Sequence, residues 1–119
     1  MEYKIRTFKD LKVWRKGIEL VKEVYRISQD FPKEEQYGLL SQMKRSAISI
    51  PSNIAEGFRR RFTREQKQFF NIAIGSSAEL ETQITIAKEL GYIDETKEYN
   101  LIILINHICG MLVNMCKRL

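Results

Sequence analysis

Residues 46–64 have the sequence SAISIPSNIAEGFRRRFTR, which joins an apolar stripe, a proline, a glycine and a run of arginines. The stripe consists of Leu40, Met43, Ala47, Ile50, Ile54 and Gly57. Because residues three and four apart lie on one side of a helix, this spacing predicts a helix. The spacing continues across Pro51, and Ala47, four residues before the proline, is small. We therefore expect one helix that is kinked at Pro51 and ends at Gly57.

The same residues allow other interpretations. Ile48 and Ile50 alternate with serines, as in a short strand over residues 47–50, and a turn at Pro51 would also explain the serines. A polar row also has the helical spacing: Ser46, Ser49, Asn53, Glu56 and Arg60. This row is either a solvated face or a polar seam that faces another helix or subunit. In a seam, Asn53 and Glu56, together with Glu79, would need hydrogen-bond partners, because buried unpaired polar groups are costly.

Three further segments have apolar stripes at helical spacing. The first stripe is Leu11, Trp14, Ile18, Val21 and Tyr25, with Val24 and Ile27 widening its apolar face, and the third is Phe70, Ala73, Ser77, Leu80, Ile84 and Ala87. The fourth is Leu101, Leu104, Ile108, Met111 and Met115, beside a second row of Ile105, Leu112 and Leu119. Short connections make sequential helices antiparallel neighbours. The prediction is an all-α fold, an antiparallel up-down-up-down four-helix bundle, with residues 1–119 as a single domain.

Local signals place the helix ends. Phe31-Pro32 ends the first helix, and Glu34 and Glu35 open the second. Thr63 and Gln66 form a capping box for the third helix, Gly91 ends it, and Asp94 caps the fourth. A glycine inside a helix costs about 1 kcal/mol relative to alanine. Gly75 and Ser76 therefore predict a close helix crossing, which we place opposite Pro51.

Basic residues are the strongest functional signal. The chain has 20 Lys and Arg against 15 Asp and Glu, a net charge of +5. The candidate nucleic-acid-binding residues are Lys12, Arg15, Lys16, Lys44, Arg45, Arg59, Arg60, Arg61, Arg64 and Lys67. Arginine is suited to bidentate phosphate contacts, and Phe58 and Phe62 could stack on unpaired bases. The alternative is a solvated basic loop whose aromatic side chains pack in the core.

Other chemistry is not indicated. His107, Cys109 and Cys116 do not form a convincing zinc set, and two cysteines seven residues apart on one helix are about 10 Å apart, too far for a disulfide. Residues 101–115 form the longest apolar stretch, which is too short to span a membrane. We expect a cytoplasmic protein that is not an enzyme, has no cofactor or metal and does not interact with a membrane.

Three separated motifs carry a family resemblance. The sequence SIPSNIAEG at 49–57 resembles the signature of the 23S rRNA intervening-sequence proteins, and FKDLKVW at 8–14 and AIGSSAEL at 73–80 fit the same pattern. The resemblance covers nearly the whole chain. It implies a four-helix bundle that assembles into a ring of five subunits. A similar fold occurs in the accessory variability determinant of diversity-generating retroelements, a basic pentamer that works with a reverse transcriptase and nucleic acid.

The leading hypothesis is therefore a non-enzymatic homopentamer that binds RNA or DNA through its basic surface. A second hypothesis is a protein-interaction scaffold, a ring that docks a partner such as a reverse transcriptase through exposed apolar rows. A third is a hydrolase that acts at the polar seam.

Overall fold

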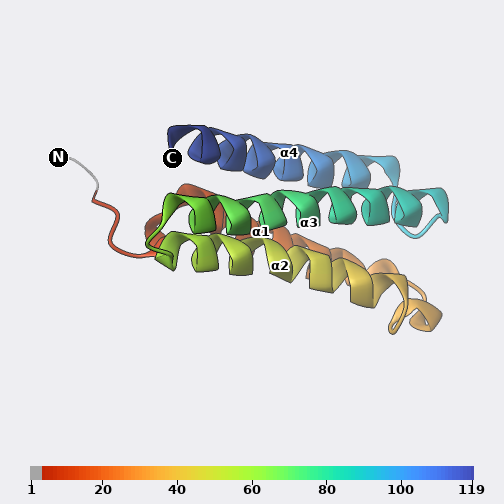
Figure 1. Ribbon diagram of the computed structural model, residues 1–119. Coiled ribbons are helices and arrows are strands. Elements are labelled where there is room, and N and C mark those ends of the chain that lie inside the picture. The colour runs from red at the N-terminus through yellow and green to blue at the C-terminus, as the bar shows by residue number, and fades with distance from the viewer. Residues whose placement is uncertain (1–3) are drawn as a thin grey trace.

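The computed structural model describes residues 4–119, and these residues form helices joined by short connections. The four long helices are α1 (Lys12–Ile27), α2 (Leu39–Arg59), α3 (Thr63–Glu89) and α4 (Glu95–Arg118). Three short 3-10 turns accompany them: η1 (Phe8–Asp10), η2 (Ser28–Asp30) and η3 (Lys33–Glu35). Figure 1 shows the long helices side by side, with the chain reversing direction at each connection. The predicted all-α four-helix fold is confirmed.

The second helix runs through Pro51 without interruption, so residues 47–50 are not a strand. All six residues of its predicted stripe are buried. Pro51 is buried as well and lies against α1 at Gly17, where an added Cβ would be 3.2 Å from the Cβ of Pro51. The absence of a side chain at Gly17 thus lets α1 and α2 approach closely. The kink at Pro51 stays a prediction.

The packing of α3 on α2 is the most extensive contact between helices, and here the predicted stripe of α3 is buried throughout. Ser49 Oγ and Ser76 Oγ are 2.8 Å apart across this contact. Gly75 itself is exposed, and a Cβ added to it would have no neighbouring atom within 4 Å. The prediction that Gly75 lies at a tight crossing opposite Pro51 is therefore wrong. The glycine that packs against Pro51 is Gly17 of α1.

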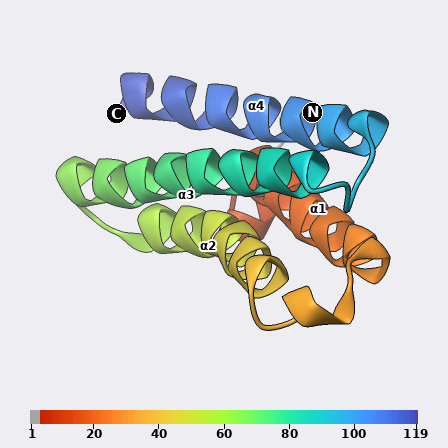
Figure 2. The same cartoon turned by 90° about the vertical axis from the view of Figure 1, so that its right-hand side faces the viewer.

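The buried faces of α1 and α4 differ from the predicted stripes. In α1 the buried residues are Val13, Gly17, Leu20, Val24 and Ile27. Val24, Ile27 and the preceding Leu11 are buried as predicted, whereas Trp14, Ile18, Val21 and Tyr25 lie along the edge of this face. In α4 they are Leu101, Ile105, Ile108 and Leu112, a combination of the two predicted rows. α4 packs on α3 and, less extensively, on α1 (Figure 2).

The connection between α3 and α4 has the predicted end signals. Gly91 has a φ of 81°, the only positive φ among residues 4–119. The amide of Gly91 donates to Lys88 O at 3.0 Å, and the amide of Tyr92 donates to Ala87 O at 2.9 Å, which is the Schellman arrangement. Asp94 Oδ1 accepts a hydrogen bond from the Lys97 amide at 2.8 Å.

Three other predicted helix ends are wrong. α2 begins at Leu39 rather than at Glu34 and Glu35, and it ends at Arg59, two residues after Gly57. The N-cap of α3 is Phe62, and Thr63 is already helical. Gln66 does not complete a capping box, because its Nε2 donates to Arg60 O at 3.1 Å across the connection.

Glu35 joins the two connections at the end of the bundle away from the chain termini. Its Oε1 accepts from the Leu39 amide at 3.3 Å, and its Oε2 accepts from the Tyr92 hydroxyl at 3.0 Å. This hydrogen bond to a carboxylate raises the pKa of Tyr92. Nearby, Lys97 Nζ donates to Asp30 Oδ2 at 2.5 Å, which raises the pKa of Lys97.

A pair of glycine substitutions tests the α2–α3 packing. An added Cβ at Gly57 would lie 2.7 Å from Cε1 of the buried Phe70 ring. We expect Gly57→Ala to lower the free energy of unfolding by about 1–3 kcal/mol, as overpacking does. The Cβ added in Gly75→Ala has no neighbouring atom within 4 Å, so this variant should raise the free energy of unfolding by about 0.5–1 kcal/mol. Urea denaturation of both variants measures the difference, and an unchanged midpoint for Gly57→Ala would contradict the packing.

Candidate nucleic-acid interface

The basic segments of the chain converge at one end of the bundle. Figure 1 shows the start of α1, the α2–α3 connection and the end of α4 at the same end. Residues 4–16, 56–67 and 114–119 contain thirteen Lys and Arg against three Asp and Glu, a net side-chain charge of +10. The rest of the chain has a net charge of −5. We call these three segments the basic end.

The end of α4 is a part of this surface that sequence reasoning missed. Lys117 and Arg118 are separated by about fifty residues from the arginines of the α2–α3 connection, and residues 68–119 as a whole have a net charge of −2. Only the up-and-down topology of the helices brings them to the same end.

Two arginines of the run 59–61 contact other side chains of the bundle. The guanidinium of Arg59 lies over the ring of Phe8, 5.3 Å from its centroid. The guanidinium of Arg60 lies 4.7 Å from the centroid of Phe69, and its Nη2 pairs with Glu56 Oε2 at 3.0 Å. Both arginines are exposed, so they still add to the local field.

Arg61, Arg64 and Lys67 have no ion pair or ring partner within residues 4–119. Arg61 and Arg64 are exposed, and Lys67 is half-buried. A free guanidinium can form two parallel hydrogen bonds with a phosphate. Among the cations of residues 59–67, these three are therefore the ones left free for an anionic partner.

Of the other predicted cations, three belong to the basic end and two do not. Lys12 and Arg15 are exposed near the start of α1, and Lys16 is half-buried there. Lys44 Nζ lies 4.6 Å from the centroid of the Tyr25 ring, and Arg45 is exposed beside it on α2. Lys44 and Arg45 lie in the first half of α2, so the structure does not bring them to the basic end.

The connection between α2 and α3 consists of residues 60–62 and is anchored on both sides. The Arg60 amide donates to Gly57 O at 3.2 Å, and the Gln66 amide donates to Phe62 O at 3.0 Å. Phe58 is half-buried against the core, whereas Phe62 is 68% exposed. The alternative that both aromatic side chains pack in the core therefore holds for Phe58 alone.

The predicted polar seam is the contact between α2 and α3. Asn53 Nδ2 donates to Ser49 O at 2.7 Å and to Ser49 Oγ at 2.9 Å, which extends the Ser49–Ser76 hydrogen bond. Glu56 is exposed and pairs with Arg60. Glu79 is exposed on α3 and does not join these hydrogen bonds, so its place in a seam that faces another subunit stays a prediction. Ser49, Asn53 and Ser76 satisfy each other's hydrogen bonds, so these residues have a structural role.

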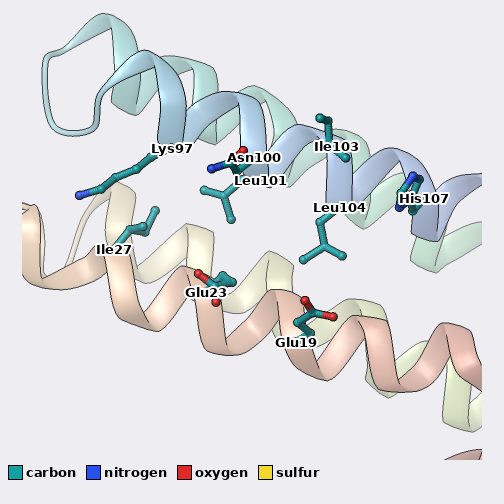
Figure 3. Close-up of a pocket in the computed structure, with 9 residues that line it drawn as sticks. All are labelled: Glu19, Glu23, Ile27, Lys97, Asn100, Leu101, Ile103, Leu104 and His107. Atoms are coloured by element: carbon teal, nitrogen blue, oxygen red, sulfur yellow. The ribbon is translucent and has the colours of Figure 1, made fainter.

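A groove of about 260 Å³ lies between α1 and α4. Its lining residues are Glu19, Glu23, Ile27, Lys97, Asn100, Leu101, Ile103, Leu104 and His107 (Figure 3). Figure 3 shows Glu19 and Glu23 on the α1 side, facing α4. Carboxylates repel phosphates, so this groove is not part of an anion-binding surface. Among residues 4–119, no group of three or more His, Cys, Asp and Glu side chains could hold a metal ion.

The last helix is apolar but largely uncovered. An 18-residue window of α4 has a mean hydropathy of 1.5, and 22% of that window is buried. Tyr99, Ile103 and Val113 are exposed large apolar residues on it, and the exposed Leu119 follows its last residue. The prediction that residues 101–115 are too short to span a membrane concerned the apolar stretch alone. The whole of α4 is longer, and by length and composition it could cross a bilayer. An apolar helix that packs against a protein partner passes the same criteria.

The fold is thus a four-helix bundle with one strongly basic end. The family model of the 23S rRNA-intervening sequence protein matches residues 9–114, and the chain belongs to this family. The membership that the motifs at 8–14, 49–57 and 73–80 predict is confirmed.

A solved structure shows the same fold. It is a protein of unknown function from the S23 ribosomal protein family of Bacteroides thetaiotaomicron, with a TM-score of 0.81 and 20% sequence identity. The alignment covers 88% of this chain and 98% of that chain. No curated protein matches the chain.

Two serine substitutions on α2 test the structural role of the seam. Ser49→Ala removes the partner of both Ser76 and Asn53, so we expect the free energy of unfolding to fall by about 1–3 kcal/mol. Ser52→Ala, on the exposed side of the same helix, is the matched control and should not destabilise the protein. Thermal or urea unfolding measures both. Equal stability of the two variants would show that the seam hydrogen bonds do not contribute.

Proposed function

We propose that this protein is a non-enzymatic, homo-oligomeric cytoplasmic protein that binds RNA or DNA through the basic end of its bundle. The observation that carries the proposal is the separation of charge, +10 in the three segments of the basic end and −5 in the rest of the chain. The family name refers to the intervening sequences of 23S rRNA in which its genes lie, so the proposal rests on the charge and not on the name.

Binding would depend on phosphate contacts. Arg61, Arg64 and Lys67 have no ion pair or ring partner in the described part of the chain, and Lys117 and Arg118 add two cations from the end of α4. Phosphate contacts release counterions, so affinity falls as salt rises. Phosphates are the same at every nucleotide, so these contacts position the nucleic acid and tolerate many sequences.

Oligomer formation would multiply these contacts. The uncovered apolar face of α4 supports the proposal of a homo-oligomer, because a partner subunit would remove this face from water. The resemblance to the intervening-sequence proteins implies five subunits. A ring with one basic end per subunit would bind a long polyanion with an avidity far above that of one subunit.

A second candidate function is a protein-interaction scaffold. The same uncovered face of α4 favours it, because a different protein could cover Ile103 and Val113. The similar fold of the accessory variability determinant would then suggest a reverse transcriptase as one partner. In this case the arginines of the basic end would not be required for docking.

A double substitution tests the proposed phosphate contacts. We expect Arg61→Ala with Arg64→Ala to weaken binding of RNA and DNA strands and to reduce the slope of log affinity against log salt by about 1.4–1.8. Lys22→Ala with Lys33→Ala removes the same charge outside the basic end and is the matched control. Fluorescence anisotropy between about 50 and 200 mM salt gives both slopes.

Two results would contradict binding through the basic end. One is an affinity of the unaltered protein that does not change with salt. The other is an equal loss of affinity in the two double variants, since a non-specific effect of net charge would produce it.

Substitutions on α4 test the oligomer. The unaltered chain should have a solution mass that is a multiple of 14.1 kDa. Ile103→Glu with Val113→Glu should reduce it to one chain, because two charges would lie in the apolar interface. Ile48→Glu, at a similarly exposed isoleucine on α2, is the control. Light scattering measures all three. A mass of 14.1 kDa for the unaltered chain would show that the protein is a monomer.

A further inference from the structure

Phe62 is the phenylalanine that the bundle leaves outside its own packing at the basic end. The ring of Phe8 packs on Trp14 and lies under Arg59, and the ring of Phe69 lies under Arg60. Phe62 is 68% exposed and has no aromatic or cationic ring partner within residues 4–119. Exposing an apolar ring to water forgoes the stabilisation that burial would give.

The backbone holds Phe62 in place. It is the N-cap residue of the long helix α3, and its carbonyl accepts from the Gln66 amide at 3.0 Å. The Gln66 side chain also fastens the preceding turn, since its Nε2 donates to Arg60 O at 3.1 Å. A ring on such an anchored backbone loses little conformational entropy when a ligand packs on it.

Free cations flank the ring in sequence. Arg61 precedes Phe62, Arg64 follows it by two residues, and neither has an ion pair within residues 4–119. An aromatic platform between cations is the combination by which proteins bind single strands, with bases stacked on the ring and phosphates held beside it.

We propose that Phe62 stacks on an unpaired base, so that the basic end prefers single-stranded nucleic acid, or an unpaired loop, over a continuous duplex. This inference rests on the proposed function, because it requires that the basic end binds nucleic acid. Bases inside a duplex are stacked on each other and offer no free face to a side chain. Unpaired bases do offer one, and every base has it, so the preference concerns strandedness and not sequence.

The test compares a single-stranded oligouridylate, whose bases stack little on each other, with a continuous duplex formed by two fully complementary strands. Phe62→Leu keeps an apolar side chain but removes the ring. It should weaken binding of the single strand by about 5- to 150-fold and leave duplex binding and the salt slope unchanged, because no charge is lost. Phe62→Tyr keeps a ring and should restore single-strand binding. Tyr37→Leu, at a 90% exposed ring outside the basic end, is the control.

A spectroscopic readout reports stacking directly. The fluorescence of 2-aminopurine in the single strand should be quenched by the unaltered protein and by Phe62→Tyr, but not by Phe62→Leu. Circular dichroism confirms that each variant keeps its helix content.

Three outcomes overturn the inference. Phe62→Leu with unaltered single-strand affinity, or with equal losses for the two probes, refutes stacking on unpaired bases. In that case the proposed function still stands if two results hold. The unaltered protein must bind in a salt-dependent manner, and the double variant Arg61→Ala with Arg64→Ala must bind more weakly. If the unaltered protein binds neither probe, the proposed function fails together with the inference.

Discussion

The structure depends on how closely α2 packs against its two neighbours. On one side Gly17 of α1 lies against Pro51, and on the other the hydroxyls of Ser49 and Ser76 are in hydrogen-bond contact. Next to the connection, Gly57 leaves room for the ring of Phe70. Larger side chains at these positions would push the helices apart. Once α2 is fixed between α1 and α3, the three-residue connection has little freedom, and the place of the basic end follows.

The sequence predicted the helices best where the apolar pattern is uninterrupted. The stripes of α2 and α3 are buried as predicted, because their small members still mark the inner face. In α1 the inner face contains Gly17, which contributes no apolar side chain, and the predicted stripe was therefore displaced to the neighbouring edge. In α4 apolar residues surround most of the helix, so spacing alone could not identify the buried row.

The helix ends were also predicted only in part from the sequence. Gly91 and Asp94 act within a few residues of their own position, and both were predicted from local signals. Gln66 fits a capping box equally well by sequence, but it bonds to Arg60 O on the preceding helix end. Local sequence does not show whether such a side chain will accept from the N-cap amide or donate to a carbonyl elsewhere.

The candidate site was predictable as a cluster but not as a surface. The run from Arg59 to Lys67 is visible in the sequence, whereas the contribution of Lys117 and Arg118 requires the topology. The topology is also needed to tell which arginines contact the bundle's own side chains and which are free. Phe8, the partner of Arg59, is about fifty residues away in sequence. Glu79 has a spacing that suits the seam, yet it is exposed on α3.

Charge separation along the bundle has a consequence for how the protein moves. Neighbouring helices run in opposite directions, so their macrodipoles largely cancel, and the side chains determine the electric dipole moment of the molecule. In the field of a polyanion this moment exerts a torque that turns the positive pole forward before contact. Rotational alignment during diffusion increases the share of productive collisions, and counterions weaken it as they screen the field.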